Sequence, residues 1–333
     1  MDDRRDSEST DARPRRRLPG WLMPLLRVVV TVALMALVLS GIKWEAFLKL
    51  LQDCDWRWWL AALGVSVLVQ VAAAIRWAFL ARPIGFPHSL GTFLWRFFEG
   101  TFFNLCLPSS IGGDVFKAFR LADSTSSRLL AGCTIVADRL AGLAAVGVLG
   151  GTALLATRGG LSLPAALAVG AALLGAAMLA FWLGVGSIDR LLALIPEQHA
   201  ARQFLARLLP YQQQPGLMTR AVAWSLLIQM GGSVAVALVA RSLGVSLPMA
   251  VWFAVVPILT LAMVLPISML GLGIREQGLE LLLKPYDVLP ERAVAIGLLW
   301  LACTILSGLI GGVLFMLDRK QSDTGRSPTD QAT

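Results

Sequence analysis

Apolar runs of bilayer length constrain this chain more than any other feature of its sequence. Stretches close to the ~20 apolar residues that cross a bilayer as a helix occur over 21–42, 58–80, 131–156, 162–185, 219–240, 248–264 and 293–317. Hydrophobic residues make up 56% of the chain and charged residues 15%, against roughly 25% charged in soluble domains. The runs predict an all-α polytopic membrane protein with about seven to eight transmembrane crossings.

A short polar motif interrupts the apolar pattern twice. One copy, LPSSIGGDVFKAFR, covers 107–120, and the other, LPISMLGLGIREQGLELL, covers 265–282. Aligned on their prolines, the copies share a serine, a glycine and a cation, which are Ser110, Gly113 and Lys117 in the first and Ser268, Gly271 and Arg275 in the second. Proline lacks an amide hydrogen and glycine admits unusual dihedral angles, so each motif is expected to break a helix. A repeated broken helix is typical of membrane transporters.

The cations predict the orientation of the chain. The net charge is +8, but the Lys and Arg residues are spread over short connections, as in loops held at the cytoplasmic face, rather than gathered for nucleic acid. The cation-bearing connections are the N-terminal tail, 82–130, 186–218 and the C-terminal tail. We therefore expect both termini in the cytoplasm of a bacterial inner-membrane protein.

This orientation forces the two motifs to enter from opposite faces. Segment 91–106 would leave the cytoplasmic side, break, and return as 114–122. Segment 248–264 would enter from outside and return outward as 274–284. The sequence thus predicts two broken re-entrant helical hairpins related as an inverted repeat.

The predicted domain organisation is simple. We expect a disordered basic cytoplasmic tail over 1–20, one transmembrane domain over 21–318, and a disordered cytoplasmic tail over 319–333. The tryptophan-rich segment 43–59 and the amphipathic segment 187–209, the latter as a helix on the cytoplasmic face, are expected to lie at the membrane interface.

The first motif predicts an anion site. The new helix would expose the amides of Gly112 and Gly113 and its positive dipole end, while Lys117 and Arg120 add full charges, so phosphate fits there. Asn104 is another polar group expected inside the membrane. The alternative is that Asp114 only caps the helix while both cations extend to head groups.

Asp138 and Arg139 are charges placed inside an apolar run. Such charges usually face a bundle interior or a cavity. Adjacent side chains point about 100° apart on a helix, so we expect separate partners: Lys117 or Arg120 for Asp138, and Asp114 or Glu99 for Arg139. They serve either as a structural ion-pair lock or in a substrate pathway. We expect Arg76 to be an anchor that extends to the membrane surface.

The second motif repeats this chemistry. Arg275 and Glu276 follow Gly271 and Gly273, as Lys117 and Asp114 follow their glycines. Glu280 lies one turn beyond Glu276, where two carboxylates suit a cation or a coupled proton, or simply the outer water interface.

Three of these motifs together resemble the transmembrane region of lysylphosphatidylglycerol synthase, a flippase-like family. They are NLCLPSSIGGDVFK over 104–117, DRLAG over 138–142 and GLGIRE over 271–276, and the resemblance covers roughly 20–318. The family usually has arginine where this chain has Lys117, and often Glu-Arg where it has Asp138-Arg139. The resemblance implies lipid movement between leaflets. The aminoacyl-transferase domain of two-part members is not expected here.

We therefore predict a flippase or transporter for a lipid with an anionic or zwitterionic head group, such as a phospholipid or a polyprenyl-phosphate-linked sugar. The alternative is a non-transporting scaffold for a lipid-modifying or glycolipid-synthesising enzyme. The expected partners are this membrane lipid, such an enzyme and a second copy of the chain, but no nucleic acid. We expect no enzymatic activity, cofactor or metal, because the sequence shows no catalytic set, no CxxC spacing and only two histidines.

Overall fold

All regular structure described in this chain is helical. The computed structural model describes residues 29, 31–33, 35, 36, 40, 43–106, 112–122, 125–157, 162–186, 188–197, 200–264 and 268–324, and none of these forms a strand. Four of the described helices are long and apolar enough to cross a membrane: α3 (Trp56–Ala81), α6 (Thr125–Thr157), α11 (Pro215–Ser242) and α14 (Pro290–Thr324). Shorter apolar stretches lie in α7 (Leu163–Val185) and α12 (Met249–Val264). The chain is thus a multipass membrane protein, as its composition predicts. Of the predicted run over 21–42, most residues lie outside the described part.

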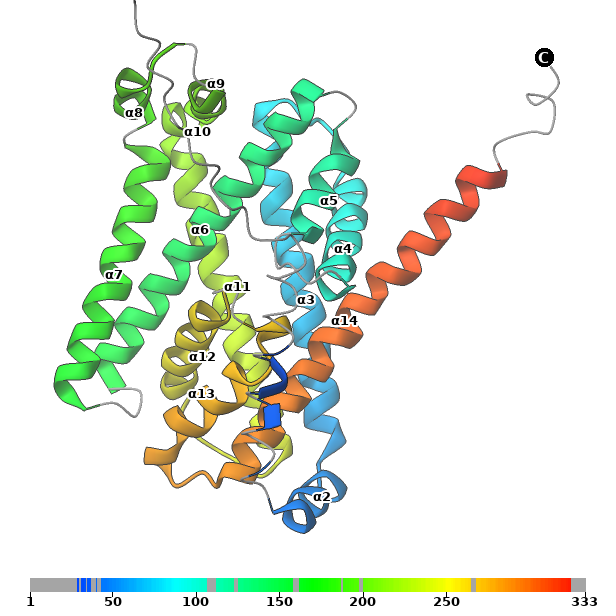
Figure 1. Ribbon diagram of the computed structural model, residues 1–333, viewed down its shortest axis with the longest axis vertical. Coiled ribbons are helices and arrows are strands. Elements are labelled where there is room, and N and C mark those ends of the chain that lie inside the picture. The colour runs from blue at the N-terminus through cyan, green and yellow to red at the C-terminus, as the bar shows by residue number, and fades with distance from the viewer. Residues whose placement is uncertain are drawn as a thin grey trace, which may run out of the picture.

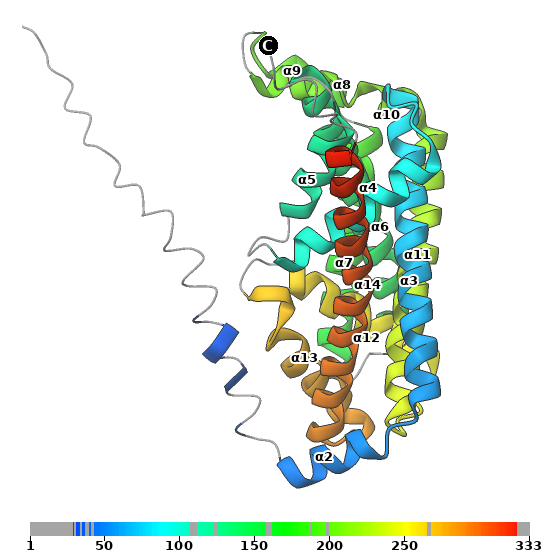
Figure 2. The ribbon, with the colours of Figure 1, turned by 90° about the vertical axis from the view of Figure 1, so that its right-hand side faces the viewer.

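Two pairs of short helices lie between the long ones. The first pair is α4 (Leu90–Cys106) with α5 (Gly112–Leu121), and the second is α12 with α13 (Ile274–Leu283). The first pair extends to the middle of the molecule from the upper end of Figure 1, whereas the second extends to the middle from the lower end, and Figure 2 shows the same arrangement. The predicted helical segments at both motifs are confirmed to within a few residues.

Short helices cover both ends of the molecule. The lower end carries α2 (Trp44–Gln52), and the upper end carries α8 (Ile188–Leu194), α9 (Ala200–Ala206) and α10 (Leu209–Gln213). The prediction of one amphipathic helix over 187–209 is wrong. Pro196 lacks an amide hydrogen and follows the end of α8, and Pro210 lies in the first turn of α10, where a proline is tolerated. Tyr211 of α10 donates a hydrogen bond to the Leu80 carbonyl oxygen at 2.9 Å. This bond joins α10 to the upper end of α3.

The buried apolar residues form one large cluster around each helix pair. The lower cluster packs α12 and α13 against α2, α3, α11 and α14, with Trp252 and Leu279 at its centre. The upper cluster packs α4 and α5 against α3, α6, α8, α10 and α11, with Trp77 and Phe93 fully buried. Each pair therefore has a core of its own.

Glycines on α14 let the first pair lie against this long helix. A Cβ added at Gly311 would overlap the carbonyl oxygen of Phe98, and one at Gly312 would lie 2.8 Å from the Phe102 ring. Lipid tails are as apolar as leucine, so close van der Waals packing of small residues holds membrane helices together. The interface between α4 and α14 depends on this close approach.

Gly311→Ala is expected to separate α14 from α4 and to lower the midpoint of thermal unfolding in detergent by several degrees, because overpacking costs about 1–3 kcal/mol. Gly64→Ala on α3 is the matched control, since nothing lies within 4 Å of its added Cβ. The control should match the parent or exceed it, as alanine favours helices over glycine. Equal midpoints for the two variants would contradict the close packing of α4 and α14.

Candidate functional site

The break between α4 and α5 is closed by a side chain. The amide of Gly113, at the start of α5, donates to Asn104 Oδ1 at 2.8 Å from the last turn of α4. The helices touch here, because a Cβ on Gly100 would lie 2.8 Å from the Gly113 carbonyl oxygen. The expectation that the amides of Gly112 and Gly113 both stay open to an anion is therefore wrong for Gly113, whose donor is already used. Ser110 lies outside the described residues.

One buried carboxylate joins two cations beside this break. Asp114 Oδ1 lies 2.8 Å from Lys117 Nζ, and Asp114 Oδ2 accepts a hydrogen bond from Arg139 Nε at 2.8 Å. The side chain of Lys117 is 6% exposed, whereas that of Arg139 is 45% exposed. The predicted pairing of Arg139 with Asp114 is confirmed. The three side chains carry one net positive charge, and Arg139 is the most exposed of the three.

Aromatic rings hold the Lys117 ammonium inside the protein. Its Nζ lies 5.0 Å from the Trp77 ring centroid and 4.7 Å from that of Phe97. Such cation–π contacts are worth about 2 kcal/mol when desolvated. The alternative that Lys117 extends to the membrane surface is therefore wrong.

Arg120 belongs to a second charge group, nearer the upper end. Glu99, whose side chain is fully buried, lies 2.9 Å from Arg96 and 3.6 Å from Arg120. Asp318 of α14 pairs with the same two arginines, at 3.1 Å from Arg96. Glu99 is thus bound to these arginines, and Arg139 takes Asp114, the other partner predicted for it. This group ties the upper part of α14 to the first helix pair.

Asp138 has a partner that the sequence analysis missed. Arg76 Nε and Nη2 donate to its two carboxylate oxygens at 2.9 and 3.0 Å, and Arg76 Nη1 donates to Ser225 Oγ at 2.6 Å. The prediction of Lys117 or Arg120 as the partner is wrong, and so is the role of Arg76 as an anchor at the membrane surface. Asp138 faces α3 and α11 while the adjacent Arg139 faces α5. The sequence feature that could have predicted this pair is one arginine in the apolar run 58–80 and one aspartate in the run 131–156.

The second helix pair closes its break differently. The Gly273 amide donates to Glu276 Oε2 at 2.6 Å, and Arg275 Nε donates to Glu276 Oε1 at 3.1 Å. Arg275 also lies over the Trp300 ring, 5.4 Å from its centroid. The φ angles of Gly271 and Gly273 are +70° and +82°, which favour glycine. Two buried atoms of this region, Arg275 Nη2 and Ser268 Oγ, have no hydrogen-bond partner among the described residues.

The two motifs do not match position by position. The helix begins four positions after Pro108 in the first copy and eight positions after Pro266 in the second. In the second copy a 3₁₀ turn, η3 (Met269–Gly271), precedes the helix. Lys117 consequently lies in the second turn of its helix and Arg275 in the first. The cations share a chemical character but not a helical position.

The candidate residues form three neighbourhoods. Asn104, Gly112, Gly113, Asp114, Lys117 and Arg139 lie where α4, α5 and α6 meet, with Arg120 nearer the upper end. Asp138 pairs with Arg76 between α3, α6 and α11. Ser268, Gly271, Gly273, Arg275 and Glu276 lie at the inner end of α13. The part of the chain that the structure describes holds no group of three His, Cys, Asp or Glu residues suited to a metal ion.

Comparison with known proteins gives one family. The family described as "Lysylphosphatidylglycerol synthase TM region" matches residues 25–312, nearly the whole chain. The match includes both helix pairs and all three neighbourhoods. A search of curated proteins found no match to the chain.

Removing one member of the Arg76–Asp138 pair is expected to destabilise the protein more than removing both. Asp138→Leu or Arg76→Met alone leaves a buried charge unpaired, which costs about 3–5 kcal/mol, whereas the double variant leaves none. Thermal unfolding in detergent measures the three variants. Asp53→Ala, at an exposed position, is the control and should stay within about 0.5 kcal/mol of the parent. A double variant with the summed loss of the two single variants would contradict the pairing.

Proposed function

The chain belongs to the lysylphosphatidylglycerol synthase TM region family, and we propose that it moves a lipid with an anionic or zwitterionic head group between the leaflets of the inner membrane. The membrane-spanning character of the chain and the family match support this proposal. The observation that carries it is the net positive, partly exposed group of Asp114, Lys117 and Arg139 beside a broken helix.

In the proposed arrangement the upper end of Figure 1 faces the cytoplasm. Exposed arginines lie in short helices or near the ends of long ones there, namely Arg82 directly after α3, Arg128 near the start of α6, Arg190 in α8 and Arg220 near the start of α11, as expected for a cytoplasmic face. The first helix pair then enters as a re-entrant hairpin from the cytoplasm and the second from outside. If each pair counts as one insertion, α3, α6, α7, α11, α14 and the predicted span over 21–42 bring the total within the predicted range of about seven to eight.

The head group of the lipid would bind to the cations at the breaks. A phosphate would add negative charge to the group of Asp114, Lys117 and Arg139, whose three side chains together carry one net positive charge. Arg139, whose Nε and Nη2 donate to Asp114 Oδ2, is the more exposed of the two cations, and its permanently charged guanidinium would attract the phosphate. Lys117 then serves mainly to hold Asp114, because its ammonium is enclosed by rings.

The second helix pair would supply a complementary contact. Arg275 Nη2 and Ser268 Oγ are buried donors without a partner in the described part of the chain. A buried unsatisfied donor costs about 1–3 kcal/mol, so a head-group oxygen that reaches them would recover this cost. Movement of one helix pair and its core relative to the other would expose these contacts to the two leaflets in turn. The separate core clusters around the two pairs support such a movement.

Reconstitution into liposomes tests this function. Fluorescent phosphatidylglycerol, phosphatidylethanolamine and phosphatidylcholine would be scored by the fraction that an impermeant quencher reaches over time. At least one lipid should move faster than in protein-free vesicles. Arg139→Gln should slow this movement about tenfold or more, because a hydrogen bond to a charged group contributes ~1.5–3 kcal/mol.

Arg128→Gln is the matched control, because Arg128 is an exposed arginine that stacks on Phe119 at the same end of the molecule. It should transport like the parent protein. Elution of each variant as one symmetric peak in size-exclusion chromatography would show that both variants are folded. Transport by Arg139→Gln at the parental rate would contradict the assigned role of Arg139. No transport of any lipid by the folded parent protein would favour a scaffold.

A further inference from the structure

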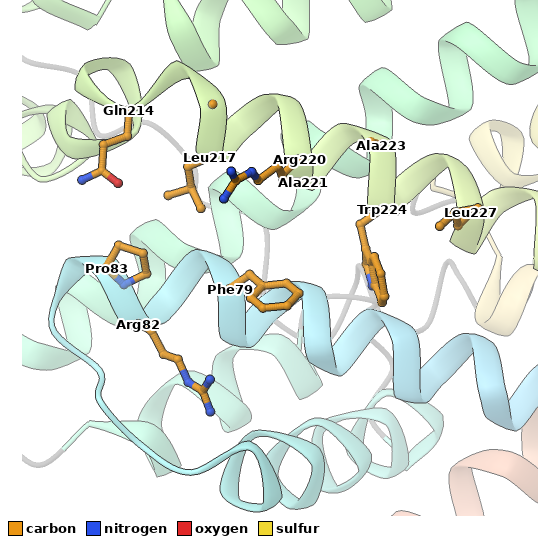
Figure 3. A pocket seen from close by; sticks show the side chains of 11 residues that line it. Phe79, Arg82, Pro83, Gln214, Leu217, Arg220, Ala221, Ala223, Trp224 and Leu227 are labelled. Carbon is orange, nitrogen blue, oxygen red and sulfur yellow. The ribbon is translucent and has the colours of Figure 1, made fainter.

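A groove on the side of the molecule lies apart from the two helix pairs. It opens between α3 and α11 near the upper end, and its volume is about 770 Å³ (Figure 3). Pockets for small ligands commonly have volumes of about 300–1,000 Å³. Both helices belong to candidate membrane spans, Trp56–Ile84 and Pro215–Ser242. A molecule in this groove would therefore reach it from the surrounding lipid.

The polar part of the groove is cationic. Arg220 extends from the second turn of α11, and Arg82 lies at the end of α3 with its side chain directed away from α11 (Figure 3). Both side chains are exposed. Arg82 uses its Nε to donate to the His88 carbonyl oxygen at 3.3 Å, and Arg220 has no hydrogen bond or ion pair with the described residues. No described carboxylate neutralises either guanidinium.

The deeper part of the groove is apolar and preformed. Phe79 of α3 faces Trp224 of α11 edge-on, with ring centroids 6.1 Å apart. The Trp224 ring is fixed because its Nε1 donates to the Ala72 carbonyl oxygen at 2.6 Å. Leu227, at 60% exposure, continues this wall toward the middle of the helix. Phe79 is 50% exposed in the same way, so the wall is open to lipid.

The order of these residues along the helix matches an amphiphile. A helix rises about 1.5 Å per residue, so Trp224 and Leu227 lie ~6 and ~10 Å deeper than Arg220. The cations then lie near the level of the head groups, and the rings and Leu227 lie at the level of acyl chains. An uncompensated cation favours an anionic head group, because a zwitterionic one adds no net charge to balance it.

We propose that this groove is a binding site for one anionic phospholipid, with its phosphate at Arg220 and an acyl chain along Phe79, Trp224 and Leu227, while Arg82 adds positive charge at the same end of the groove. The site binds lipid whether or not the protein moves lipid between leaflets, since it uses none of the residues assigned to transport. It is a lateral site on the span pair α3 and α11, and the lipid bound there fills a cavity between them.

Native mass spectrometry of the purified full chain in detergent tests the proposal. The protein would be titrated with phosphatidylglycerol and, separately, with phosphatidylcholine of the same chain length. One phosphatidylglycerol should stay bound at a detergent concentration that removes phosphatidylcholine. Arg82→Gln with Arg220→Gln should lower the bound phosphatidylglycerol at least fivefold. Ala223→Trp, which fills the groove and keeps both arginines, should lower it as much.

Arg128→Gln with Arg190→Gln is the matched control, because it removes two exposed arginines from the same end of the molecule but outside the groove. This control should bind phosphatidylglycerol like the parent protein. Equal binding of the two lipids, an equal loss in the control, or full binding by the groove variants would each overturn the proposal. The arginine variants change only exposed side chains, so we expect them to fold. They therefore test lipid binding even if Ala223→Trp does not fold.

Discussion

A backbone amide inside a bilayer has no water to pair with, and this constraint governs how the two helix breaks are built. The first pair satisfies the Gly113 amide with Asn104, nine positions before it. The second satisfies the Gly273 amide with Glu276, three positions after it. The breaks can therefore lie in the middle of the molecule, with the buried cations Lys117 and Arg275 in the helices that follow them. Without these acceptors, the short helices would have to end at the surface.

The buried charges divide into groups with different tasks. The pair of Arg76 and Asp138 is neutral and enclosed, and it joins α3, α6 and α11. Asp318 attaches α14 to the first helix pair through Arg96, also without excess charge, because Glu99 and Asp318 balance Arg96 and Arg120. The group around Asp114 is different, since one carboxylate holds two cations there. Two neutral charge groups beside one positively charged group are the arrangement expected if only the group around Asp114 binds a ligand.

The sequence predicted the helices better than the contacts between them. Apolar length and broken motifs located α3, α6, α7, α11 and both short pairs, because these features are local. The partner of Asp138 could not be predicted in the same way. The helix α6 is apolar on most sides, so its sequence gives little information about which face turns to α3. The offset between the two motifs was hidden for a similar reason, because the 3₁₀ turn at Met269–Gly271 depends on glycine dihedral angles. The groove between α3 and α11 exists only through their packing.

Cysteine accessibility measures most directly whether the two helix pairs enter from opposite faces. Single cysteines at Pro87, before α4, and at Leu289, after α13, would replace exposed residues in a chain whose four native cysteines are changed to alanine. An impermeant maleimide would then be applied to right-side-out and inside-out membrane vesicles. The account predicts that Leu289→Cys is labelled in right-side-out vesicles and Pro87→Cys in inside-out vesicles. Labelling of both positions in the same vesicles would contradict it.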